Sequence, residues 1–221
     1  SGACGPCSEI HYDMGPESGC GRPDCKPGCD CDRYFEIWNL VFPQYFQSAD
    51  GTRKQLKKPG IDTGMGLERL LSVLQGVKSI YGTDLLMPLV TAIGDLVEEA
   101  TGLRPDDDRI SIEQAVIADH SRAVGFAIAE GILPSNEAQG YVIRRLIRRA
   151  VRRGRALGIT EPFLYRLTGV VAETMQEAHQ HLVQKREHVA LVVKSEEERF
   201  QETLAQGSGV LEGAVVNGTP G

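Results

Sequence analysis

Four cysteines lie within twelve residues of one another near the start of the chain, at a spacing that lets their thiols bind one metal ion. Glycines and prolines between them supply turns and no hydrophobic core. Four thiolates can close tetrahedrally around zinc, and such a closed site is structural and not catalytic. Free thiols on a surface loop and a structural disulfide are the alternatives. The candidate metal ligands are Cys20, Cys25, Cys29 and Cys31.

Residues 60–75 place an acid and an arginine on either side of two glycines. Gly64 and Gly66 allow positive φ and let a ligand approach the backbone, because they carry no Cβ. Asp62 is then placed to hold an ammonium group. Arg69 falls opposite the leucine stripe of the helix expected to follow, so it is free to reach a phosphate. A tight strand–helix turn with a solvated arginine explains the same spacing.

Residues 141–158 contain seven arginines, no lysine and no acid. On a helical wheel the apolar residues, centred on Ile143, occupy one side and the arginines the other. One face therefore packs on the domain and the other offers guanidinium groups to phosphates, although a merely solvated helix face has the same pattern. The arginines are Arg144, Arg145, Arg148, Arg149, Arg152, Arg153 and Arg155.

The distribution of charge supports one localised anion-binding surface. The net charge of the chain is −6, so the +7 of the arginine segment leaves −13 for the remaining residues. An acidic body with a single dense basic segment does not bind polyanions over its whole surface.

Composition places the chain among globular proteins, with 41% hydrophobic and 24% charged residues in a length of 221. That length allows one large domain or two small ones. No apolar run approaches the ~20 residues that cross a bilayer, so we expect no membrane association. All six cysteines lie within the first 31 residues, which argues against a protein stapled by disulfides and favours a reducing, cytoplasmic location.

The periodicity predicts an α+β chain whose strands precede its helices. Strands are expected over 8–13 and in the aromatic segment 34–46, where a buried strand ends near Pro43. A hairpin turn over 48–51 lets 52–58 pair back, and a glycine-rich turn or short strand leads to a helix over 67–75. Further helices are expected over 85–101, 111–130, 138–157 and 161–180, followed by a long polar helix to about 206. We therefore predict two domains, 1–84 and 85–221.

The string Gly64-Met65-Gly66-Leu67-Glu68-Arg69 resembles motif 3 of the class II aminoacyl-tRNA synthetases, glycine-x-glycine-hydrophobic-glutamate-arginine. The wider segments 62–75, 36–42 and 5–10 resemble the alanyl-tRNA synthetases, and the likeness extends to about residue 206. It implies that residues 1–84 are the C-terminal part of a class II aminoacylation domain, with an antiparallel sheet, the motif 3 helix and a Cys-rich insert at 20–31. Residues 85–221 would be an all-α tRNA-recognition domain.

The resemblance also implies ligands and their residues. ATP with Mg²⁺ would be bound by Arg69, Glu36 and Gly66. L-alanine would be bound by Asp62, Asn39, Val41 and Gly64. On a regular strand the side chains of Glu36 and Asn39 point to opposite faces, so both serve one site only across a bulge or a twist.

The segment from Asp119 through Pro134-Ser135-Asn136-Glu137 to Arg153 resembles the tRNA-recognition domain of the same family. There the asparagine matching Asn136 reads the G3·U70 pair of the tRNA(Ala) acceptor stem, a role that suits an amide with both a donor and an acceptor. Ser135 or Asn136 is also a candidate N-cap, and one amide does not fill both roles well. The phosphate contacts would come from Arg144, Arg145, Arg148, Arg149, Arg152 and Arg153.

The function implied is the ATP-dependent attachment of alanine to tRNA through alanyl-adenylate. Motifs 1 and 2 of the class do not occur in this sequence, so we expect an internal fragment that forms no adenylate by itself. The alternative is a non-enzymatic, zinc-stapled RNA-binding module. A G3·U70 stem compared with a G3·C70 stem separates the two hypotheses, because a generic module binds both equally.

Overall fold

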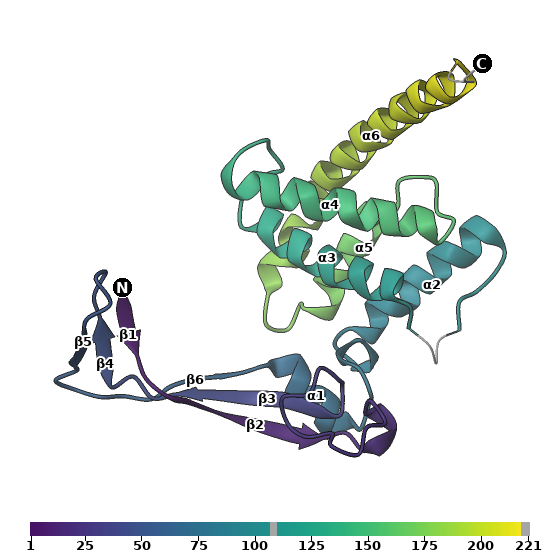
Figure 1. Cartoon of the computed structure of the whole chain (residues 1–221). Coiled ribbons are helices and arrows are strands. Elements are labelled where there is room, and N and C mark those ends of the chain that lie inside the picture. The colour runs from purple at the N-terminus through teal and green to yellow at the C-terminus, as the bar shows by residue number, and fades with distance from the viewer. Residues whose placement is uncertain (107–109, 218–221) are drawn as a thin grey trace. The chain divides into compact units, whose positions relative to one another are not determined.

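The structure is a computed structural model that describes residues 1–106 and 110–217. The chain divides into two compact units, Ser1–Thr83 and Asp84–Gly221, called here the strand unit and the helical unit. The described strands all lie in the strand unit, and five of the six described α-helices lie in the helical unit (Figure 1). The predicted α+β class is confirmed. None of the described helices is long and apolar enough to span a membrane.

One antiparallel sheet of the strand unit has the order β1-β4-β5. Its hairpin turn follows the prediction: the Ser48 N–H donates to the Thr52 carbonyl oxygen at 2.9 Å, and Gly51 has a φ of 84° that favours glycine. The strands are β1 (Gly2–Cys4), β4 (Tyr45–Gln47) and β5 (Arg53–Gln55).

The second antiparallel sheet has the order β2-β3-β6, with β3 in the centre. The strand expected in segment 34–46 is β3, which ends at Val41, before Pro43, a residue with no N–H to donate; the rest of the segment enters β4. The expectation that this strand is buried is wrong, since every residue of β3 is half-buried. The strands are β2 (Cys7–Asp13), β3 (Tyr34–Val41) and β6 (Asp62–Met65).

A bulge interrupts the pairing of β2 with β3. Ile10 pairs with Trp38, but the next residue of β2, His11, pairs with Glu36. Ile37 is therefore an extra residue on β3 that has no partner on β2. Because of it, side chains that precede Ile37 point to the opposite face from the one that regular alternation would give them.

Helix α1 (Leu67–Gln75) directly follows β6 and has the predicted bounds. It ends at Gly76, whose left-handed φ of 67° is typical of a helix C-terminus. Two short 3₁₀ helices, η1 (Pro16–Ser18) and η2 (Ile80–Gly82), complete the strand unit.

In the helical unit the helix predicted over 161–180 is shorter than expected. It ends at Thr174, and the chain turns over residues 175–179 so that α6 packs back against α5. The side-chain pattern did not reveal this turn, because it contains no glycine or proline. The helices are α2 (Met87–Thr101), α3 (Ile112–Ala129), α4 (Ala138–Ala156), α5 (Leu164–Thr174) and α6 (Gln180–Asn217).

The arginine-rich helix α4 is held in the unit by its apolar stripe. Ile147 and Val151 are fully buried, and Gly154 packs directly on Phe163: a Cβ at Gly154 would lie 2.3 Å from Cε1 of that ring. This face is fixed by packing, so the arginines are presented on the opposite side.

The N-terminus of α5 is capped from another helix. The buried carboxylate of Glu197, on α6, accepts the backbone N–H groups of Phe163, Leu164 and Tyr165 at 3.0, 2.9 and 3.0 Å. Burial raises the pKa of the Glu197 carboxyl, and the three donors oppose that rise because they stabilise its ionised form.

Candidate functional site

Four of the residues expected to bind an amino acid lie on one face of the β2-β3-β6 sheet. Asn39 pairs with Gly64, and Val41 pairs with Asp62. Paired residues share a face, and so do residues two apart on one strand. One face of the sheet therefore carries two adjacent pairs of these residues, Val41 with Asp62 and Asn39 with Gly64.

The bulge at Ile37 brings Glu36 to that same face. Glu9 and His11 are two apart on β2, and they pair with Asn39 and Glu36 respectively. All four side chains consequently point to one side of the sheet. The conflict that regular alternation predicts for Glu36 and Asn39 is removed by the extra residue.

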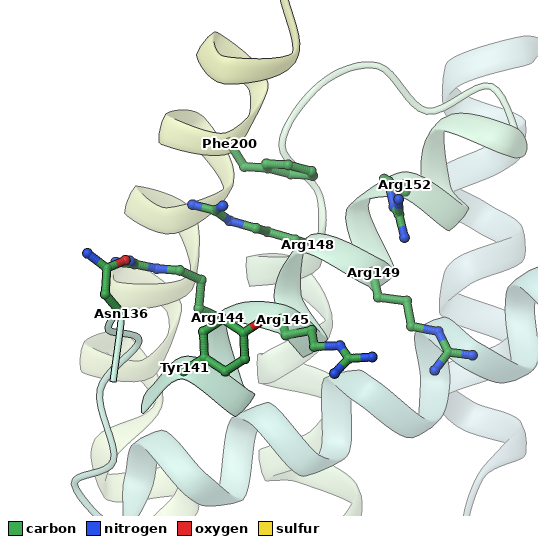
Figure 2. Close-up of a pocket in the computed structure, with 8 residues that line it drawn as sticks. All are labelled: Asn136, Tyr141, Arg144, Arg145, Arg148, Arg149, Arg152 and Phe200. Atoms are coloured by element: carbon green, nitrogen blue, oxygen red, sulfur yellow. The ribbon is translucent and has the colours of Figure 1, made fainter. Parts of the chain in front are cut away.

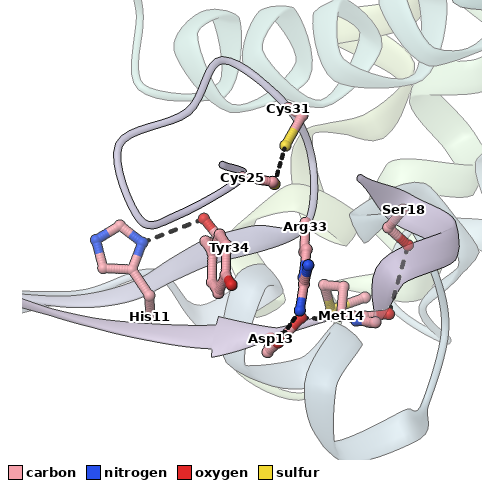
Figure 3. A network of polar contacts seen from close by, with 9 residues as sticks. His11, Asp13, Met14, Ser18, Cys25, Cys31, Arg33 and Tyr34 are labelled. Atoms are coloured by element: carbon pink, nitrogen blue, oxygen red, sulfur yellow. Dashed lines mark hydrogen bonds and ion pairs between the residues drawn. The ribbon is translucent and has the colours of Figure 1, made fainter. Parts of the chain in front are cut away.

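Glu9 and His11 form a hydrogen-bonded chain on this face that sequence reasoning missed. Asn39 Nδ2 donates to Glu9 Oε1 at 3.2 Å, and the other carboxylate oxygen lies 3.1 Å from His11 Nε2. His11 Nδ1 lies 3.1 Å from the Tyr34 carbonyl oxygen (Figure 3). The bond to Tyr34, followed by the bond to Glu9, raises the pKa of His11. The alternating Glu-x-His in the predicted strand 8–13 was the available signal.

Arg69 lies beside Glu36. Its Nη1 donates to the Glu36 carbonyl oxygen at 2.8 Å and is 3.7 Å from the Glu36 carboxylate, while the guanidinium stands 5.2 Å from the ring centre of Phe35. A Cβ on Gly66 would come within 3.2 Å of the Arg69 side chain. Arg69, Glu36 and Gly66 are thus together, whereas Asp62 lies further along the same face.

The two glycines of the motif do not adopt the positive φ that the sequence allowed. Gly66 has a φ of −74° and directly precedes α1. A Cβ added to Gly64 would meet no other atom within 4 Å, so the backbone there faces open space. What these glycines contribute is the absence of a side chain and not an unusual backbone conformation.

The four cysteines of the insert form a cluster in which every Sγ lies within 4.8 Å of the others. The Cys20–Cys29 and Cys25–Cys31 Sγ pairs are both 3.6 Å apart. Tetrahedral zinc with Zn–S bonds of about 2.3 Å separates its sulfurs by about 3.8 Å, so the cluster fits this ion.

Basic and polar contacts hold the cluster together. Arg22 donates to Cys20 Sγ at 3.3 Å and to Cys29 Sγ at 2.9 Å, and it lowers the pKa of Cys20 to about 6. At the base of the loop, Arg33 forms two bonds to the Asp13 carboxylate at 2.9 and 3.0 Å (Figure 3). The loop therefore presents thiols of which at least one is readily ionised, which is the state that binds metal.

The arginines of α4 fall into two groups by burial. Arg144, Arg148 and Arg153 are half-buried, and each forms an ion pair of 3.0 to 3.1 Å, the first two with Glu196 and the third with Glu113. The exposed group forms no ion pair with any residue in the described part of the chain. It consists of Arg145, Arg149, Arg152 and Arg155.

A cavity of about 500 Å³ opens on this helix, and we call its lining the arginine surface (Figure 2). Guanidinium groups make up most of the lining, so the cavity suits a polyanion. Its members are Asn136, Tyr141, Arg144, Arg145, Arg148, Arg149, Arg152 and Phe200. Of the predicted RNA-binding residues, Arg153 alone lies outside it.

Asn136 does not cap α4, so that prediction is wrong. The N-cap residue is Glu137, without a side-chain cap, and Ser135 bonds locally to its backbone: the Ser135 hydroxyl accepts the Glu137 N–H at 3.3 Å. The Asn136 Oδ1 instead accepts a hydrogen bond from Arg144 Nη1 (Figure 2). The side chain of Asn136 is therefore turned to the arginine surface.

The model of the family "tRNA synthetases class II (A)" matches residues 1–219. The chain is 54% identical to an alanine–tRNA ligase of Desulforamulus reducens over 216 residues, which is 98% of this chain and 24% of that protein. It is 54% identical to that of Pelotomaculum thermopropionicum over 210 residues (95% and 24%), and 51% identical to that of Desulfosudis oleivorans over 211 residues (96% and 24%). The chain thus spans about a quarter of the length of these relatives. It belongs to the class II (A) tRNA synthetases and is similar to one segment of the alanine–tRNA ligases.

Proposed function

We propose that this chain contributes part of the alanine and ATP site, and the surface for the tRNA acceptor stem, of an alanine–tRNA ligase. The strand unit is assigned to aminoacylation and the helical unit to tRNA recognition. The observation that supports this most directly is the shared face of the β2-β3-β6 sheet, where the bulge at Ile37 aligns Glu36 with Asn39 and Asp62. The alanine carboxylate would attack the α-phosphorus of ATP and displace pyrophosphate to give alanyl-adenylate; the tRNA 3′-terminal hydroxyl would then accept the alanyl group and release AMP.

The amino acid would bind on this face of the sheet, beside Asp62, Val41 and Asn39. The Asp62 carboxylate is exposed and attracts the α-ammonium group. Because Asn39 Nδ2 donates to Glu9, its Oδ1 is left to accept from the same ammonium. Val41 stands beside Asp62 on this face and would limit the side chain of the substrate to a small one.

The nucleotide would lie at the other end of the face. Arg69 is exposed enough to exchange its bond to Glu36 for a phosphate, which it can bind through two parallel N–H groups. Glu36 offers one carboxylate for Mg²⁺, an ion that usually takes one or two protein carboxylates and fills its shell with water and phosphate oxygens. Arg69 would stabilise the charge that develops on the transferring phosphate.

The isolated chain is expected to show no alanine-dependent exchange of pyrophosphate with ATP. Asp62 is exposed and Asn39 is half-buried, so the face that would hold the substrates is open to water, and adenylate formation needs a site that excludes it. Exchange of labelled pyrophosphate, measured beside a full-length alanine–tRNA ligase, tests this. Turnover by the chain alone would contradict the assignment of the site as partial.

The arginine surface would bind the acceptor stem of tRNA(Ala). Exposed guanidinium groups contact phosphates along the backbone, and Asn136, at the edge of the cavity, would contact the G3·U70 pair. Phosphate contacts supply affinity without sequence information, so discrimination between stems must come from the few groups that reach base edges.

A G3·U70 hairpin is expected to bind the chain about 5- to 100-fold more tightly than a G3·C70 hairpin of the same length, which is the range for one specific contact. Titration by fluorescence anisotropy at one fixed salt concentration measures the ratio. Asn136→Ala should bring the two affinities together by weakening binding to the G3·U70 hairpin. Equal binding of both hairpins by the unmodified chain would instead favour a generic RNA-binding module.

We further propose that the cysteine cluster holds a structural Zn²⁺. The four sulfurs fill a tetrahedral shell, so no position stays open for a substrate, and the ion would serve to fix the loop between β2 and β3. Arg22 would balance part of the negative charge of four thiolates around a divalent ion.

The chain purified under reducing conditions is expected to contain about one zinc ion, since four thiolates complete one structural site. Cys29→Ser should lose most of it, whereas Cys7→Ser, which removes an exposed thiol outside the cluster, should retain it. Metal content by mass spectrometry and the absorption of a Co²⁺-substituted sample report this. A Cys7→Ser protein that loses as much metal as Cys29→Ser, or a reduced chain without metal, would contradict the site.

A further inference from the structure

We infer that Glu196 is a positioning residue of the arginine surface: its buried carboxylate fixes Arg144, and through Arg144 it fixes the amide of Asn136 with the NH₂ group directed outward. The contacts are independent of any assigned ligand. The consequence for specificity rests on the proposed function, in which Asn136 contacts the acceptor stem.

The carboxylate of Glu196 lies between two guanidinium groups. Its side chain is 4% exposed, and its Oε1 is 3.0 Å from Arg144 Nε and 3.1 Å from both Arg148 Nε and Nη2. A buried carboxylate is costly unless it is paired, so the two arginines cannot leave it without a large penalty. Both are thereby restrained on the side of α4 that faces α6.

Arg148 is held on a second side by an aromatic ring. Its guanidinium stands 5.1 Å from the ring centre of Phe200, which is one helical turn after Glu196 on α6. Glu196 and Phe200 therefore contact the same arginine from the same helix, and Glu196 also pairs with Arg144.

Arg144 transmits this restraint to Asn136. Its Nε lies 3.0 Å from Glu196 Oε1 in an ion pair without hydrogen-bond geometry, and its Nη1 donates to Asn136 Oδ1. A guanidinium carries donors and no acceptor, so only the carbonyl oxygen of the amide can face it. The orientation of the Asn136 amide is thus determined, although its side chain lies at the surface.

An amide held in this way presents its NH₂ group to a ligand and withholds its oxygen. The view that Asn136 offers a donor and an acceptor together is therefore revised to a donor. Its partner on an RNA helix must be an acceptor, such as O2 or N3 of a base or a ribose oxygen in the shallow groove. Fixing the amide before binding also lowers the entropy cost of the contact.

Two measurements on the full chain test this role, with Glu196→Gln as the variant. Glutamine keeps the shape and one oxygen but removes the charge that holds two arginines. Glu198→Gln is the matched control, because Glu198 is two residues away on α6, is 53% exposed and pairs only with Lys194 at 4.0 Å among the described residues. The first readout is the side-chain NH₂ signal of Asn136 by NMR without RNA. The second is the G3·U70 to G3·C70 affinity ratio.

In Glu196→Gln the Asn136 NH₂ signal is expected to shift and the stem preference to fall at least about fivefold, toward equality, while affinity for the G3·C70 hairpin changes less. The Glu198→Gln protein should match the unmodified chain in both. If Glu196→Gln lowers the melting temperature, Arg144→Lys replaces it, because a single ammonium cannot hold Glu196 and Asn136 in the fixed geometry of a guanidinium.

The outcomes are distinct. An unchanged NH₂ signal in a Glu196→Gln protein of normal melting temperature, or in Arg144→Lys where that variant replaces it, would overturn the inference, whatever the RNA result. A shifted signal with an unchanged stem preference would overturn the role in specificity and leave the proposed function standing. No preference in the unmodified chain would count against the proposed function, and the role in specificity would fall with it.

Discussion

Replacing Glu197 with alanine is expected to lower the free energy of unfolding of the helical unit by roughly 3 to 5 kcal/mol. The carboxylate accepts three backbone N–H groups at the start of α5, and each buried donor left without a partner costs about 1–3 kcal/mol. Since domains of this size are stable by about 5–15 kcal/mol, this one contact accounts for a large part of the stability of the unit.

Glu197→Gln should cost less, roughly 1 to 2 kcal/mol. Its Oε1 can still accept the N–H groups of Phe163 and Leu164, but its NH₂ group would face the N–H of Tyr165, where two donors meet. It also loses the negative charge that interacts favourably with a helix N-terminus. The order of stability should therefore be glutamate, then glutamine, then alanine.

Thermal and urea unfolding followed by circular dichroism at 222 nm measure these differences. The adjacent Glu198→Ala removes an exposed carboxylate with a weak i,i+4 contact to Lys194, and it should change the stability by no more than about 0.5 kcal/mol. Equal effects of the two alanine variants would show that the capping of α5 by Glu197 contributes little.

The strands and helices were largely predictable because their signals are local. Alternation and turn residues identified β2 and the hairpin of β4 and β5, and Gly66 and Gly76 mark the two ends of α1. The buried stripe of α4 follows from its apolar spacing alone. Each of these features is encoded within a few residues of sequence, so no tertiary contact has to be known.

The arrangement of the sheet face was not predictable from alternation. The extra residue at Ile37 is visible only in the pairing of β3 with β2, and without it Glu36 would face away from Asn39. Glu9 became a candidate only when the register placed it beside Asn39. A bulge depends on two strands at once, so a pattern read along one strand does not locate it.

The side-chain network of the helical unit was missed for a similar reason. Glu196 and Glu197 look alike in an acidic stretch of a polar helix, yet one pairs with arginines of α4 and the other caps α5. The N-cap expected of Ser135 or Asn136 was wrong: the helix begins after Glu137, and the Asn136 side chain bonds to Arg144. These partners are 8 to 48 residues apart in sequence, beyond the range of any local pattern.

Arg149→Glu combined with Arg152→Glu is expected to weaken binding of an acceptor-stem hairpin by about 100-fold or more at physiological salt, and to reduce the slope of log affinity against log salt by about 2. Both side chains are exposed, line the cavity and form no ion pair within the described residues, so their charge is available to phosphates. Arg148 is a poorer choice for reversal, because a glutamate there would meet the buried Glu196.

The same substitutions should leave the fold intact or stabilise it slightly. Arg145 and Arg149 are four residues apart on α4, as are Arg148 and Arg152, and like charges at this spacing repel. Each reversal turns a repulsive pair into an attractive one worth about 0.2–0.5 kcal/mol, so α4 should melt no earlier than in the unmodified chain. Loss of RNA binding without loss of stability would show that the exposed arginines serve binding and not folding.

The control is Arg166→Glu with Arg186→Glu, which changes the net charge equally at two positions outside α4. Arg166 pairs with Glu99 on the surface at 2.9 Å, a contact worth at most about 1 kcal/mol. If binding responds only to net charge, the two double variants will lose affinity together. If RNA lies along the arginine surface, the control will keep most of its affinity and its salt dependence, since counterions are released only where phosphates meet the protein.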